Sequence, residues 1–409
     1  MRIFLFSNHF PFGKSEPFIA NEIPFAIEKN EIIVNALYKT RHVNHSGSFE
    51  ANGFIDLNAT KFQLLIKGVF NFAPFRFHLV EIFQKGLLLK PSQLKQHLTS
   101  LLIARSVMST PQWVKLVKAV NNSEDGLLYY YWGDNLVWTL PYLLRKIQGK
   151  RRVVIRLHRT DLYEYLKSNH SPLRERIFES ADLICPVSQD GLNYLSLKYP
   201  QFSNKIKLFR LGVFDKGLNP KSTSNKLLCV SASYVTPVKQ VHLIFEALQK
   251  VEQDIEWHHF GDGPLLAELN TLVASKRKGL KIFLHGAVPN EQILQFYALN
   301  SVSFFINASK SEGVPVSIME ALSFGLPIIA PTVGGIGELL NSKNGVLLSP
   351  IFMLDDLVSA IQKLIKLSES EKNLYRTAAR NTYEELASAS IVYPNFYSQL
   401  SNLQEDGRN

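Results

Sequence analysis

Apolar and polar positions along the chain follow two alternating periods. Short apolar runs typical of buried strands, such as Ile3–Phe6 and Glu31–Leu37, alternate with longer segments such as Glu16–Asn30, where apolar residues recur at helical spacing. Strands separated by helices of ten or more residues predict parallel sheets covered by helices on both faces. Further strand-like runs are Leu127–Tyr131, Val153–Leu157, Leu183–Val187, Leu227–Ala232, Ile255–Phe260, Lys281–Leu284, Ser303–Asn307 and Pro327–Ala330.

The length of the chain predicts two domains. A chain of 409 residues exceeds the size at which single hydrophobic cores stop growing. The polar segment Lys216–Asn225, which contains Pro, Gly and Ser, has the composition of a linker. We predict an α/β protein of two Rossmann-like, doubly wound domains that face each other across a cleft. The predicted boundaries are 1–215 and 225–375, and residues 376–409 are expected to form helices that cross back to the N-terminal domain.

The charge of the chain is unevenly distributed. Residues 1–220 contain 29 Lys and Arg against 17 Asp and Glu, whereas residues 221–409 contain 16 against 18. A basic half beside a nearly neutral half indicates that one domain faces an anionic surface. Because the sequence contains no helix-turn-helix, zinc-finger or aromatic ribonucleoprotein motif, a phospholipid surface is favoured over nucleic acid.

The segment Phe62–Lys90 departs from the alternating pattern. It is rich in Phe and Leu with interspersed basic residues, so it predicts either an inserted helical pair or a contact with a membrane interface. No window predicts a transmembrane helix, and the N-terminus lacks a signal-peptide pattern. The widely separated Cys185 and Cys229 are expected to be reduced core residues. We therefore expect a cytoplasmic protein, with peripheral contact at the inner membrane face as an open alternative.

A candidate anion site lies in the stretch Ser309–Ala330. Pro315 suits the first turn of a helix, and Gly325 marks its end. The free amides and the dipole of such a helix start favour a bound diphosphate. Glu312 precedes this helix and Glu320 lies two turns inside it, at the strand edge where open α/β sheets bind ligands. Both glutamates also fit simpler roles, as an N-terminal charge and a surface residue.

Several motifs together resemble glycosyltransferase family 4, whose members have the GT-B fold. The pattern Glu312-x7-Glu320 is followed by Gly325-x-Pro327 and by the pair Gly334-Gly335 before Glu338. Within the family, the sequence is similar to bacterial capsule, exopolysaccharide and O-antigen transferases. The other segments that carry the resemblance are Ser15–Ile19 with Glu22-Ile23, Arg156–Tyr163, Lys239, Phe260–Pro264 and Gly286-x-Val288.

The resemblance implies roles for the charged residues of the second half. Glu312 would hold hydroxyls of the transferred sugar, Glu320 would bind the nucleotide ribose, and Lys239 would neutralise the diphosphate leaving group. A solvated lysine at a helix start is the alternative for Lys239. Phosphate contacts would come from the backbone of Gly313, Val314, Pro315 and Val316.

Other donor contacts follow from the resemblance with more alternatives. Gly261 and Gly263 would allow a tight turn beside the nucleotide, and Val288 would bind the base through its backbone. An ordinary strand-to-helix turn and an ordinary apolar loop residue explain these positions equally. Many family members carry an arginine shortly before the lysine, but the run Val230–Lys239 contains none. Either Ser233 or another residue must then contact the phosphate.

The first half contains the remaining candidates. The resemblance implies that His158, at a strand end, contacts the donor sugar and helps to stabilise developing charge. Arg156 is either an acceptor-phosphate contact or a surface charge. Gly13 and Ser15 belong to a loop that would receive an acceptor, although Ser15 also fits a helix cap. We predict Asp161 to be a helix N-cap.

The resemblance to this family implies a retaining hexosyltransferase. It would use a UDP- or GDP-linked sugar as substrate, with a saccharide or lipid-linked acceptor, and would require no cofactor and no metal, since no Asp-x-Asp triplet occurs. The domain 1–215 would be the acceptor side and 225–375 the nucleotide-sugar-binding side. Two alternatives remain open: a nucleotide-sugar 2-epimerase of the same fold, and a non-catalytic nucleotide-binding assembly partner.

Overall fold

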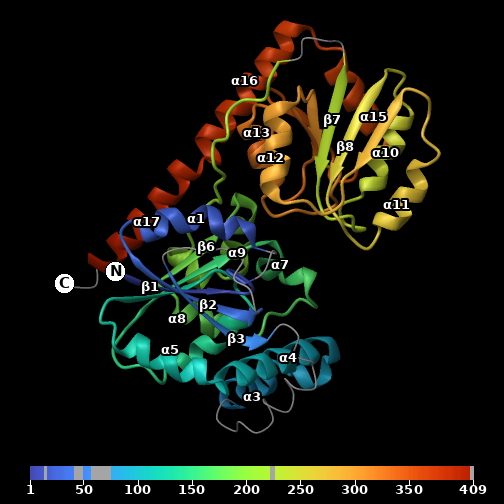
Figure 1. The fold of residues 1–409 in the computed structure, drawn as a ribbon. Coiled ribbons are helices and arrows are strands. Elements are labelled where there is room, and N and C mark those ends of the chain that lie inside the picture. The colour runs from blue at the N-terminus through green and yellow to red at the C-terminus, as the bar shows by residue number, and fades with distance from the viewer. Residues whose placement is uncertain (13–15, 41–48, 57–74, 222–225, 406–409) are drawn as a thin grey trace. The chain divides into compact units, whose positions relative to one another are not determined.

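The chain divides into two compact units, residues 1–209 and 210–409. The computed structural model describes residues 1–12, 16–40, 49–56, 75–221 and 226–405. Within this described part, each unit contains one six-stranded sheet in which all paired strands are parallel (Figure 1). The predicted fold class is confirmed in that both units are parallel α/β sheets flanked by helices.

The first sheet has the strand order β3-β2-β1-β4-β5-β6. The chain adds β2 and β3 on one side of β1 and then β4 to β6 on the other side, so the sheet is doubly wound. Helix α1 lies on one face, and α5 and α8 lie on the other (Figure 1). The strands are β1 (Arg2–Ser7), β2 (Glu31–Lys39), β3 (Glu50–Asp56), β4 (Gly126–Tyr130), β5 (Arg152–Leu157) and β6 (Leu183–Pro186). The helices are α1 (Pro17–Ile27), α3 (Phe75–Gln84), α4 (Pro91–Met108), α5 (Pro111–Asn121), α6 (Leu140–Leu143), α7 (Arg159–Leu162), α8 (Arg174–Ser180) and α9 (Gln189–Lys198), with 3-10 turns η1 (Leu87–Leu89), η2 (Asn135–Thr139), η3 (Glu164–Leu166) and η4 (Pro200–Lys205).

The second sheet has the order β12-β11-β10-β7-β8-β9. Helices α10, α11 and α15 lie on one face, and α12 and α13 lie on the other (Figure 1). The strands are β7 (Leu227–Ala232), β8 (Ile255–Phe260), β9 (Leu280–Leu284), β10 (Phe304–Ile306), β11 (Ile328–Pro331) and β12 (Gly345–Leu348). The helices are α10 (Val241–Gln249), α11 (Leu266–Val273), α12 (Asn290–Leu299), α13 (Val316–Ser323), α14 (Ile336–Leu339), α15 (Leu354–Ile365), α16 (Glu369–Leu386) and α17 (Ala389–Glu405).

The predicted strand runs all correspond to strands of the structure, and they include the edge strands β6 and β9. Two strands were missed, β3 and β12, and each lies at the edge of a sheet. Three of the seven residues of β3 are buried, and β12 has four residues, so each gives little periodicity to recognise. Cys185 in β6 and Cys229 in β7 are buried and free, in keeping with core positions.

The boundary between the units follows residue 209, six residues before the predicted end of the first domain. Helices α16 and α17, which contain residues 376–409 as far as the structure describes them, are grouped with the second unit, where α16 packs against α13 and α14. The expected return of residues 376–409 to the first domain stays a prediction.

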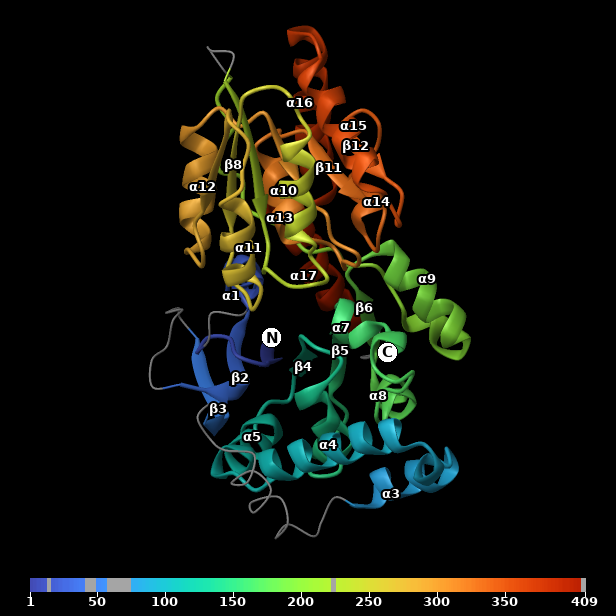
Figure 2. The ribbon, with the colours of Figure 1, turned by 90° about the vertical axis from the view of Figure 1, so that its right-hand side faces the viewer.

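The segment Phe62–Lys90 is only partly described. Residues 57–74 lie outside the described part, and residues 75–90 form α3, η1 and the turns beside them. Helix α3 packs on α4, and α4 in turn packs on α5 (Figure 2). The described end of this segment therefore fits the helical alternative. Among the described helices, none has the length and apolar character required to cross a bilayer.

Candidate functional site

The predicted donor residues of the second unit follow the carboxyl ends of its strands. Lys239 lies in the loop after β7, Gly261 and Gly263 follow β8, Val288 follows β9, and Glu312 follows β10. Because all these strands are parallel and neighbouring, their carboxyl ends meet at one edge of the sheet. The sheet topology thus brings together residues that are up to 73 positions apart in sequence.

An ion pair joins two of these loops. The Nζ of Lys239 lies 2.6 Å from Oε1 of Glu312, which also accepts a hydrogen bond of 3.2 Å from Nδ2 of Asn307. Glu312 and Asn307 are buried, whereas a quarter of the Lys239 side chain is exposed. The backbone reinforces the pairing, since Lys310 N donates to the Val238 carbonyl at 2.8 Å. Lys239 is therefore not the freely solvated lysine that was the simpler alternative.

Asn307 was not predicted as a functional residue. It comes directly after β10, where its Oδ1 accepts a hydrogen bond from Ser309 N while its Nδ2 donates to Glu312. The amide thereby fixes both the loop and the glutamate that the loop carries. A polar residue that follows a short buried strand is the sequence signal that would have found it.

Close backbone packing explains two of the glycines. A Cβ on Gly334, whose φ is +55°, would lie 2.0 Å from the Glu312 carbonyl oxygen. The next residue, Gly335, donates its N–H to the Gly313 carbonyl at 2.7 Å. The Gly334-Gly335 pair therefore holds the loop that carries Glu312 by direct backbone contact, which a side chain at Gly334 would prevent.

The loop after β8 is packed in the same way. A Cβ on Gly261, with φ of +144°, would lie 1.9 Å from the Ser233 carbonyl oxygen. Ser233 N donates to the Phe260 carbonyl, and Val235 N donates to the Asp262 carbonyl. Gly263 is the second glycine of this loop, and a Cβ there would lie 2.5 Å from the Val235 carbonyl oxygen. The structure therefore joins Ser233 to the glycine loop through its main chain, and the predicted phosphate contact of its side chain stays a prediction.

Helix α13 begins at Val316, and Pro315 is its N-cap. Pro315 was expected to lie in the first turn, so the helix begins one residue later than predicted. The amides of Ile318 and Met319 donate to the Pro315 carbonyl. The first N–H groups of an α-helix have no acceptor within the helix. In α13 these groups come directly after the segment that contains Gly313 and Val314. The predicted anion-binding segment Gly313–Val316 is therefore the entrance to a helix whose dipole favours negative charge.

Glu320 lies inside α13 and is buried, so its reading as a surface residue is wrong. Its Oε1 accepts a hydrogen bond of 2.8 Å from Nδ2 of Asn290, the first residue of α12. Burial raises the pKa of Glu320 to about 7, and the Asn290 hydrogen bond opposes part of this rise. Asn290 was not predicted, although it follows Val288 by two positions in the same loop. It connects the predicted base-binding loop to the predicted ribose-binding residue.

In the first unit, His158 is buried at the end of β5 among aromatic rings. Its ring lies 4.4 Å from the Trp132 centroid and 5.2 Å from that of Tyr131. Neither ring nitrogen has a hydrogen-bond partner in the part of the chain that the structure describes. Burial, and then the charge of Arg156, hold the pKa of His158 well below its ordinary value, so the imidazole is neutral. A buried imidazole with two available nitrogens is suited to a polar ligand.

Asp161 holds the main chain of this histidine. Its Oδ1 accepts the His158 N–H at 2.8 Å, and its Oδ2 accepts the Gly133 N–H at 2.5 Å. The prediction that Asp161 is a helix N-cap is wrong, because His158 occupies that position and Asp161 is the third residue of α7. Asp161 instead fixes the backbone that presents His158.

The predicted acceptor contact of Arg156 is contradicted by its position. Arg156 is fully buried in β5, its Nη2 lies 3.4 Å from Oε2 of Glu22 in α1, and its guanidinium lies over the rings of Tyr129 and Tyr131. Both readings, as an acceptor contact and as a surface charge, are therefore wrong. Arg156 links the sheet to α1 because a buried guanidinium requires a nearby carboxylate.

The predicted acceptor residues Gly13 and Ser15 lie outside the described residues. Glu16, which follows them, was missed by the sequence analysis. Its carboxylate accepts hydrogen bonds from the amides of Asn8, His9 and Phe10, and from the indole of Trp132. Glu16 therefore organises the loop at the carboxyl end of β1.

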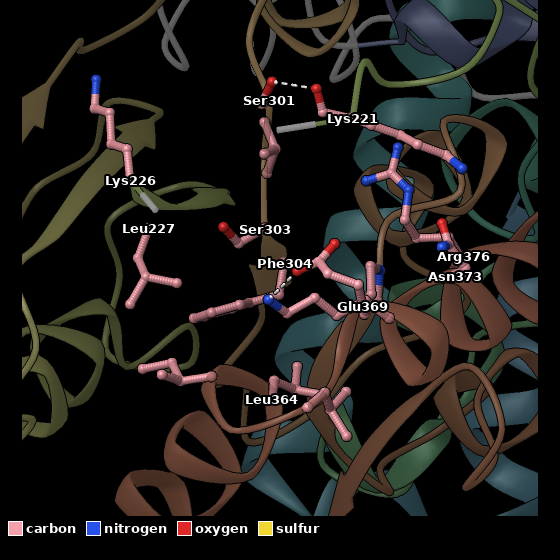
Figure 3. Close-up of a pocket in the computed structure, with 15 residues that line it drawn as sticks. Lys221, Lys226, Leu227, Ser301, Ser303, Phe304, Leu364, Glu369, Asn373 and Arg376 are labelled. Atoms are coloured by element: carbon pink, nitrogen blue, oxygen red, sulfur yellow. Dashed lines mark hydrogen bonds and ion pairs between the residues drawn. The ribbon is translucent and has the colours of Figure 1, made fainter. Parts of the chain in front are cut away.

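A separate pocket of the second unit lies at the amino ends of the strands, opposite their carboxyl ends (Figure 3). Leu227 and Phe304, which begin β7 and β10, line it together with Lys221, Lys226 and Arg376. Since Lys239 and Glu312 follow the other ends of the same two strands, this pocket is not part of the site described above.

A comparison with family models identifies the class of the second unit. Residues 215–381, which include Lys239, Glu312 and Glu320, match the family model described as "Glycosyl transferases group 1". The chain is a glycosyltransferase that carries a group 1 domain. The ion pair of this glycosyltransferase and the start of its α13 both lie within the matched segment. The finer resemblance to family 4 stays a prediction.

Two curated proteins are similar to this glycosyltransferase, one over nearly its whole length and one over more than half of it. The chain is 25% identical over 423 residues to the amylovoran biosynthesis glycosyltransferase AmsK of Erwinia amylovora, covering 98% of this chain and 100% of that protein. It is 24% identical to the putative colanic acid biosynthesis glycosyltransferase WcaL of Escherichia coli, over 59% of this chain and 60% of that one.

Two solved structures show the same fold. Anabaena Alr3699/HepE, in complex with UDP, has a TM-score of 0.69 at 15% identity and covers 98% of this chain and 100% of its own. Sucrose-phosphate synthase from Thermosynechococcus elongatus has a TM-score of 0.71 at 15% identity, with 99% and 100% covered.

Removing the partner of Arg156 is expected to destabilise the glycosyltransferase. Glu22→Ala leaves a buried guanidinium without its carboxylate, which costs about 3–5 kcal/mol of unfolding free energy. Glu28→Ala, at the exposed end of the same helix, is the matched control. Denaturant unfolding of both variants measures the difference, and equal stability of the two would contradict the assigned role.

The buried carboxyl of Glu320 predicts a pH-dependent stability. Because its pKa is about 7 in the folded state and 4.5 in the unfolded state, its favourable contribution is complete below pH 4.5 and is lost as the pH rises through 7. A shift of one pKa unit corresponds to about 1.4 kcal/mol, so the loss amounts to at most about 3.4 kcal/mol.

Glu320→Gln removes this ionisation and keeps an oxygen for Asn290. The variant is therefore expected to gain stability relative to wild type between about pH 5 and pH 8. The exposed Glu268→Gln serves as the control and should follow wild type at both pH values. Thermal unfolding measures this difference, and parallel pH profiles of Glu320→Gln and wild type would exclude a buried titration.

Proposed function

We propose that this glycosyltransferase moves a hexose from a UDP- or GDP-linked donor to a growing, lipid-linked surface polysaccharide, with retention of the anomeric configuration. The observation that carries the proposal is the Lys239–Glu312 ion pair beside the start of α13. This arrangement offers one cation, a set of helix amides and one carboxylate at the ligand-binding edge of a parallel sheet.

The ion pair explains how the donor would be recognised. Before binding, Glu312 neutralises the partly exposed Lys239 ammonium. A nucleoside diphosphate brings negative charge that draws Lys239 towards the phosphates, where the dipole of α13 also acts. The Glu312 carboxylate, still held by Asn307, then accepts hydrogen bonds from the hydroxyls of the sugar. Diphosphate and sugar thus each take over one partner of the pair.

Glu320 and Asn290 would bind the nucleoside part of the donor. Glu320 is tied to the loop containing Val288 through its 2.8 Å hydrogen bond with Asn290. Its carboxylate is a suitable acceptor for the two ribose hydroxyls, while the backbone of the Val288 loop would contact the base. This placement is supported by the position of both residues at the same strand edge as Lys239. The donor contact proposed for His158 rests on its neutral, buried imidazole and its two unpartnered nitrogens.

The proposed chemistry needs no protein nucleophile. The acceptor hydroxyl attacks the anomeric carbon on the side from which the diphosphate leaves, and the departing phosphate oxygen takes the hydroxyl proton. One C–O bond forms and one breaks, with retained configuration. Lys239 and the α13 amides stabilise the charge that develops on the diphosphate, which is an electrostatic effect of preorganised groups. No metal is assigned a role in this step.

The acceptor class is supported by relatives and by charge. AmsK and WcaL are named for amylovoran and colanic acid biosynthesis, and both names denote bacterial polysaccharides. Anabaena HepE was solved with UDP and with UDP-glucose, which supports a nucleotide-sugar donor. The basic first half, 29 Lys and Arg against 17 Asp and Glu, suits a lipid-linked diphosphate at an anionic membrane surface.

A nucleotide-sugar screen tests the proposal. A donor that binds only the folded state at a hundred times its Kd stabilises the protein by about 2.7 kcal/mol, so its melting temperature rises. We expect UDP- or GDP-sugars to raise the melting temperature and one of them to support transfer to an isolated lipid-linked precursor, with the anomeric configuration of the product read by NMR. Conversion of the donor without acceptor would instead identify an epimerase, and binding without turnover a non-catalytic partner.

Replacing Lys239 tests the central assignment. Lys239→Ala removes one donor to the departing diphosphate, so kcat is expected to fall by about 10²–10³-fold. Lys310→Ala removes an exposed lysine from the neighbouring loop and is the matched control, expected to keep wild-type kcat. Steady-state kinetics and melting temperatures of both variants are compared. A folded Lys239→Ala enzyme with near-normal kcat would refute the assignment.

A further inference from the structure

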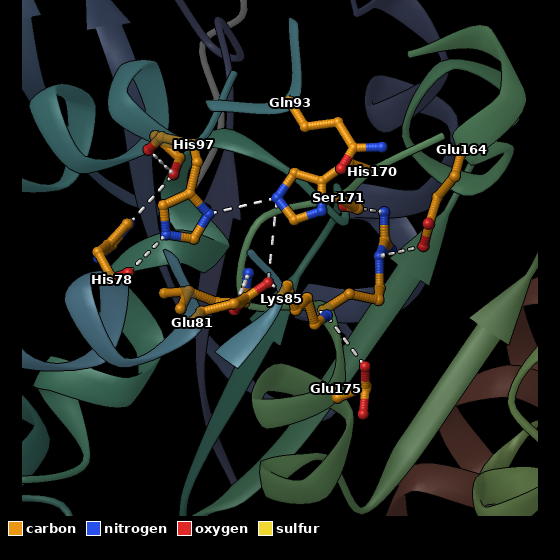
Figure 4. Close-up of polar contacts among 12 residues, drawn as sticks. His78, Glu81, Lys85, Gln93, His97, Glu164, His170, Ser171 and Glu175 are labelled. Carbon is orange, nitrogen blue, oxygen red and sulfur yellow. Dashed lines mark hydrogen bonds and ion pairs between the residues drawn. The ribbon is translucent and has the colours of Figure 1, made fainter. Parts of the chain in front are cut away.

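Three buried side chains from separate segments of the first unit converge on one point. They are Glu81 on α3, His97 on α4 and His170 in the segment after η3 (Figure 4). One donor atom of each residue lies within 4.8 Å of the corresponding atoms of the other two. Two imidazoles and one carboxylate form a donor set that transition metals, and zinc in particular, commonly take in proteins.

The distances between the donors are close to those of a metal site. His97 Nδ1 lies 3.3 Å from His170 Nε2, and His170 Nε2 lies 4.0 Å from Glu81 Oε1. In a tetrahedral zinc site with Zn–N distances of about 2.0–2.1 Å, neighbouring nitrogens are about 3.4 Å apart. The two histidines already have this spacing. The carboxylate oxygen lies 4.0 Å from His170 Nε2 and within 4.8 Å of the His97 donor atom, so it has to move towards the histidines by rotation of its side chain.

The surrounding hydrogen bonds orient the donors. His97 Nε2 lies 3.1 Å from the His78 carbonyl oxygen, which only accepts hydrogen bonds, so Nε2 carries the proton and Nδ1 presents its lone pair to His170. A backbone carbonyl bound to the far ring nitrogen is a frequent support of metal-ligating histidines. Glu81 is oriented in a similar way, since its Oε2 accepts a hydrogen bond of 3.0 Å from Leu173 N.

Lys85 is the cation that a metal ion would have to displace. Its Nζ lies 3.2 Å from Glu81 Oε1 and 3.0 Å from Glu175 Oε1. The lysine is partly exposed and retains Glu175 as a partner when it leaves Glu81 (Figure 4). Glu81 Oε1 is held by Lys85 and not by a backbone donor, so a metal ion would take this oxygen at the loss of one shared ion pair.

We propose that Glu81, His97 and His170 form a structural zinc site. The ion would fasten the helical pair α3 and α4 to the segment that follows η3, and a water molecule would complete its coordination. In the metal-free protein His170 Nε2 donates to His97 Nδ1, so His170 has to carry its proton on Nδ1 instead when Nε2 binds zinc, which is a change of tautomer without net release of a proton. The proposal concerns the first unit only and is independent of the donor residues Lys239, Glu312 and Glu320.

The position of the site connects it to the main chain that carries His158. Ser171, next to His170, accepts a hydrogen bond of 2.6 Å from Arg174, and Arg174 also donates to the Asp161 carbonyl. The carboxylate of Asp161 in turn holds the His158 N–H. A metal ion at His170 would therefore stabilise the segment on which this hydrogen-bond network depends.

Metal titration of the full chain tests the proposal. The purified protein is stripped with a chelator and titrated with Zn²⁺, and separately with Co²⁺, whose visible absorption reports its coordination. We expect one equivalent to bind and to raise the melting temperature. Loss of a residue that only supports a metal ligand typically lowers metal affinity by about 10–100-fold. His170→Gln and Glu81→Gln are expected to lower zinc affinity by more than this.

His285→Gln is the matched control. His285 pairs with His258 at 2.9 Å in the second unit, so it is a histidine in a close histidine pair away from the proposed site. This variant should keep wild-type zinc affinity. Loss of binding in His285→Gln, unchanged binding in the Glu81 and His170 variants, or no binding of Zn²⁺ and Co²⁺ by folded wild-type protein would each overturn the proposal. If one variant fails to fold, the other variant and the Co²⁺ spectrum of the wild type decide.

Discussion

The constraint on which the site depends is that every strand of the second sheet runs in the same direction. Their carboxyl ends meet at one edge, and each of the loops after β7, β8, β9 and β10 supplies part of the candidate site. The Lys239–Glu312 ion pair is a direct consequence, since it joins two neighbouring strands, β7 and β10, whose residues are far apart in sequence. Any change that altered the strand order would separate this cation from its carboxylate.

Close backbone contacts make this edge rigid. Gly334 and Gly261 leave no room for a Cβ against the carbonyls of Glu312 and Ser233, so each loop is packed on the main chain of another. Asn307 and Asn290 then fix the two buried glutamates through side-chain amides. Carboxylates held in this way present fixed acceptors to a ligand and lose little conformational freedom on binding.

The first unit uses buried polar groups for a different purpose. Arg156 and Glu22 join the sheet to α1, Asp161 holds the amide of His158, and Glu16 gathers the amides of the loop after β1. Each of these is a charged or carboxyl group that the fold has removed from water and must therefore pair with a specific partner. The proposed zinc site follows the same logic, because the His97 imidazole and the Glu81 carboxylate are already held by backbone groups.

The sequence by itself determined the class of fold and indicated which residues are candidates for binding a donor. Apolar periodicity depends only on local spacing, so it identified the central strands, and the signature around Glu312 and Glu320 marked a helix start at a strand end. It missed β3, in which three of seven residues are buried, and β12, which has four residues, because so short a buried run gives little periodicity to recognise. It also misread Arg156, since nothing local reveals that Glu22 lies opposite it.

Only the tertiary structure decided which residues meet. Asn307 and Asn290 gained a role because sheet topology placed them against Glu312 and Glu320. Glu81, His97 and His170 have no characteristic spacing in the sequence and converge only when α3, α4 and the segment after η3 pack together, so no metal ligands were expected. Local pattern specifies elements, whereas contacts between distant segments require the packing of those elements in three dimensions.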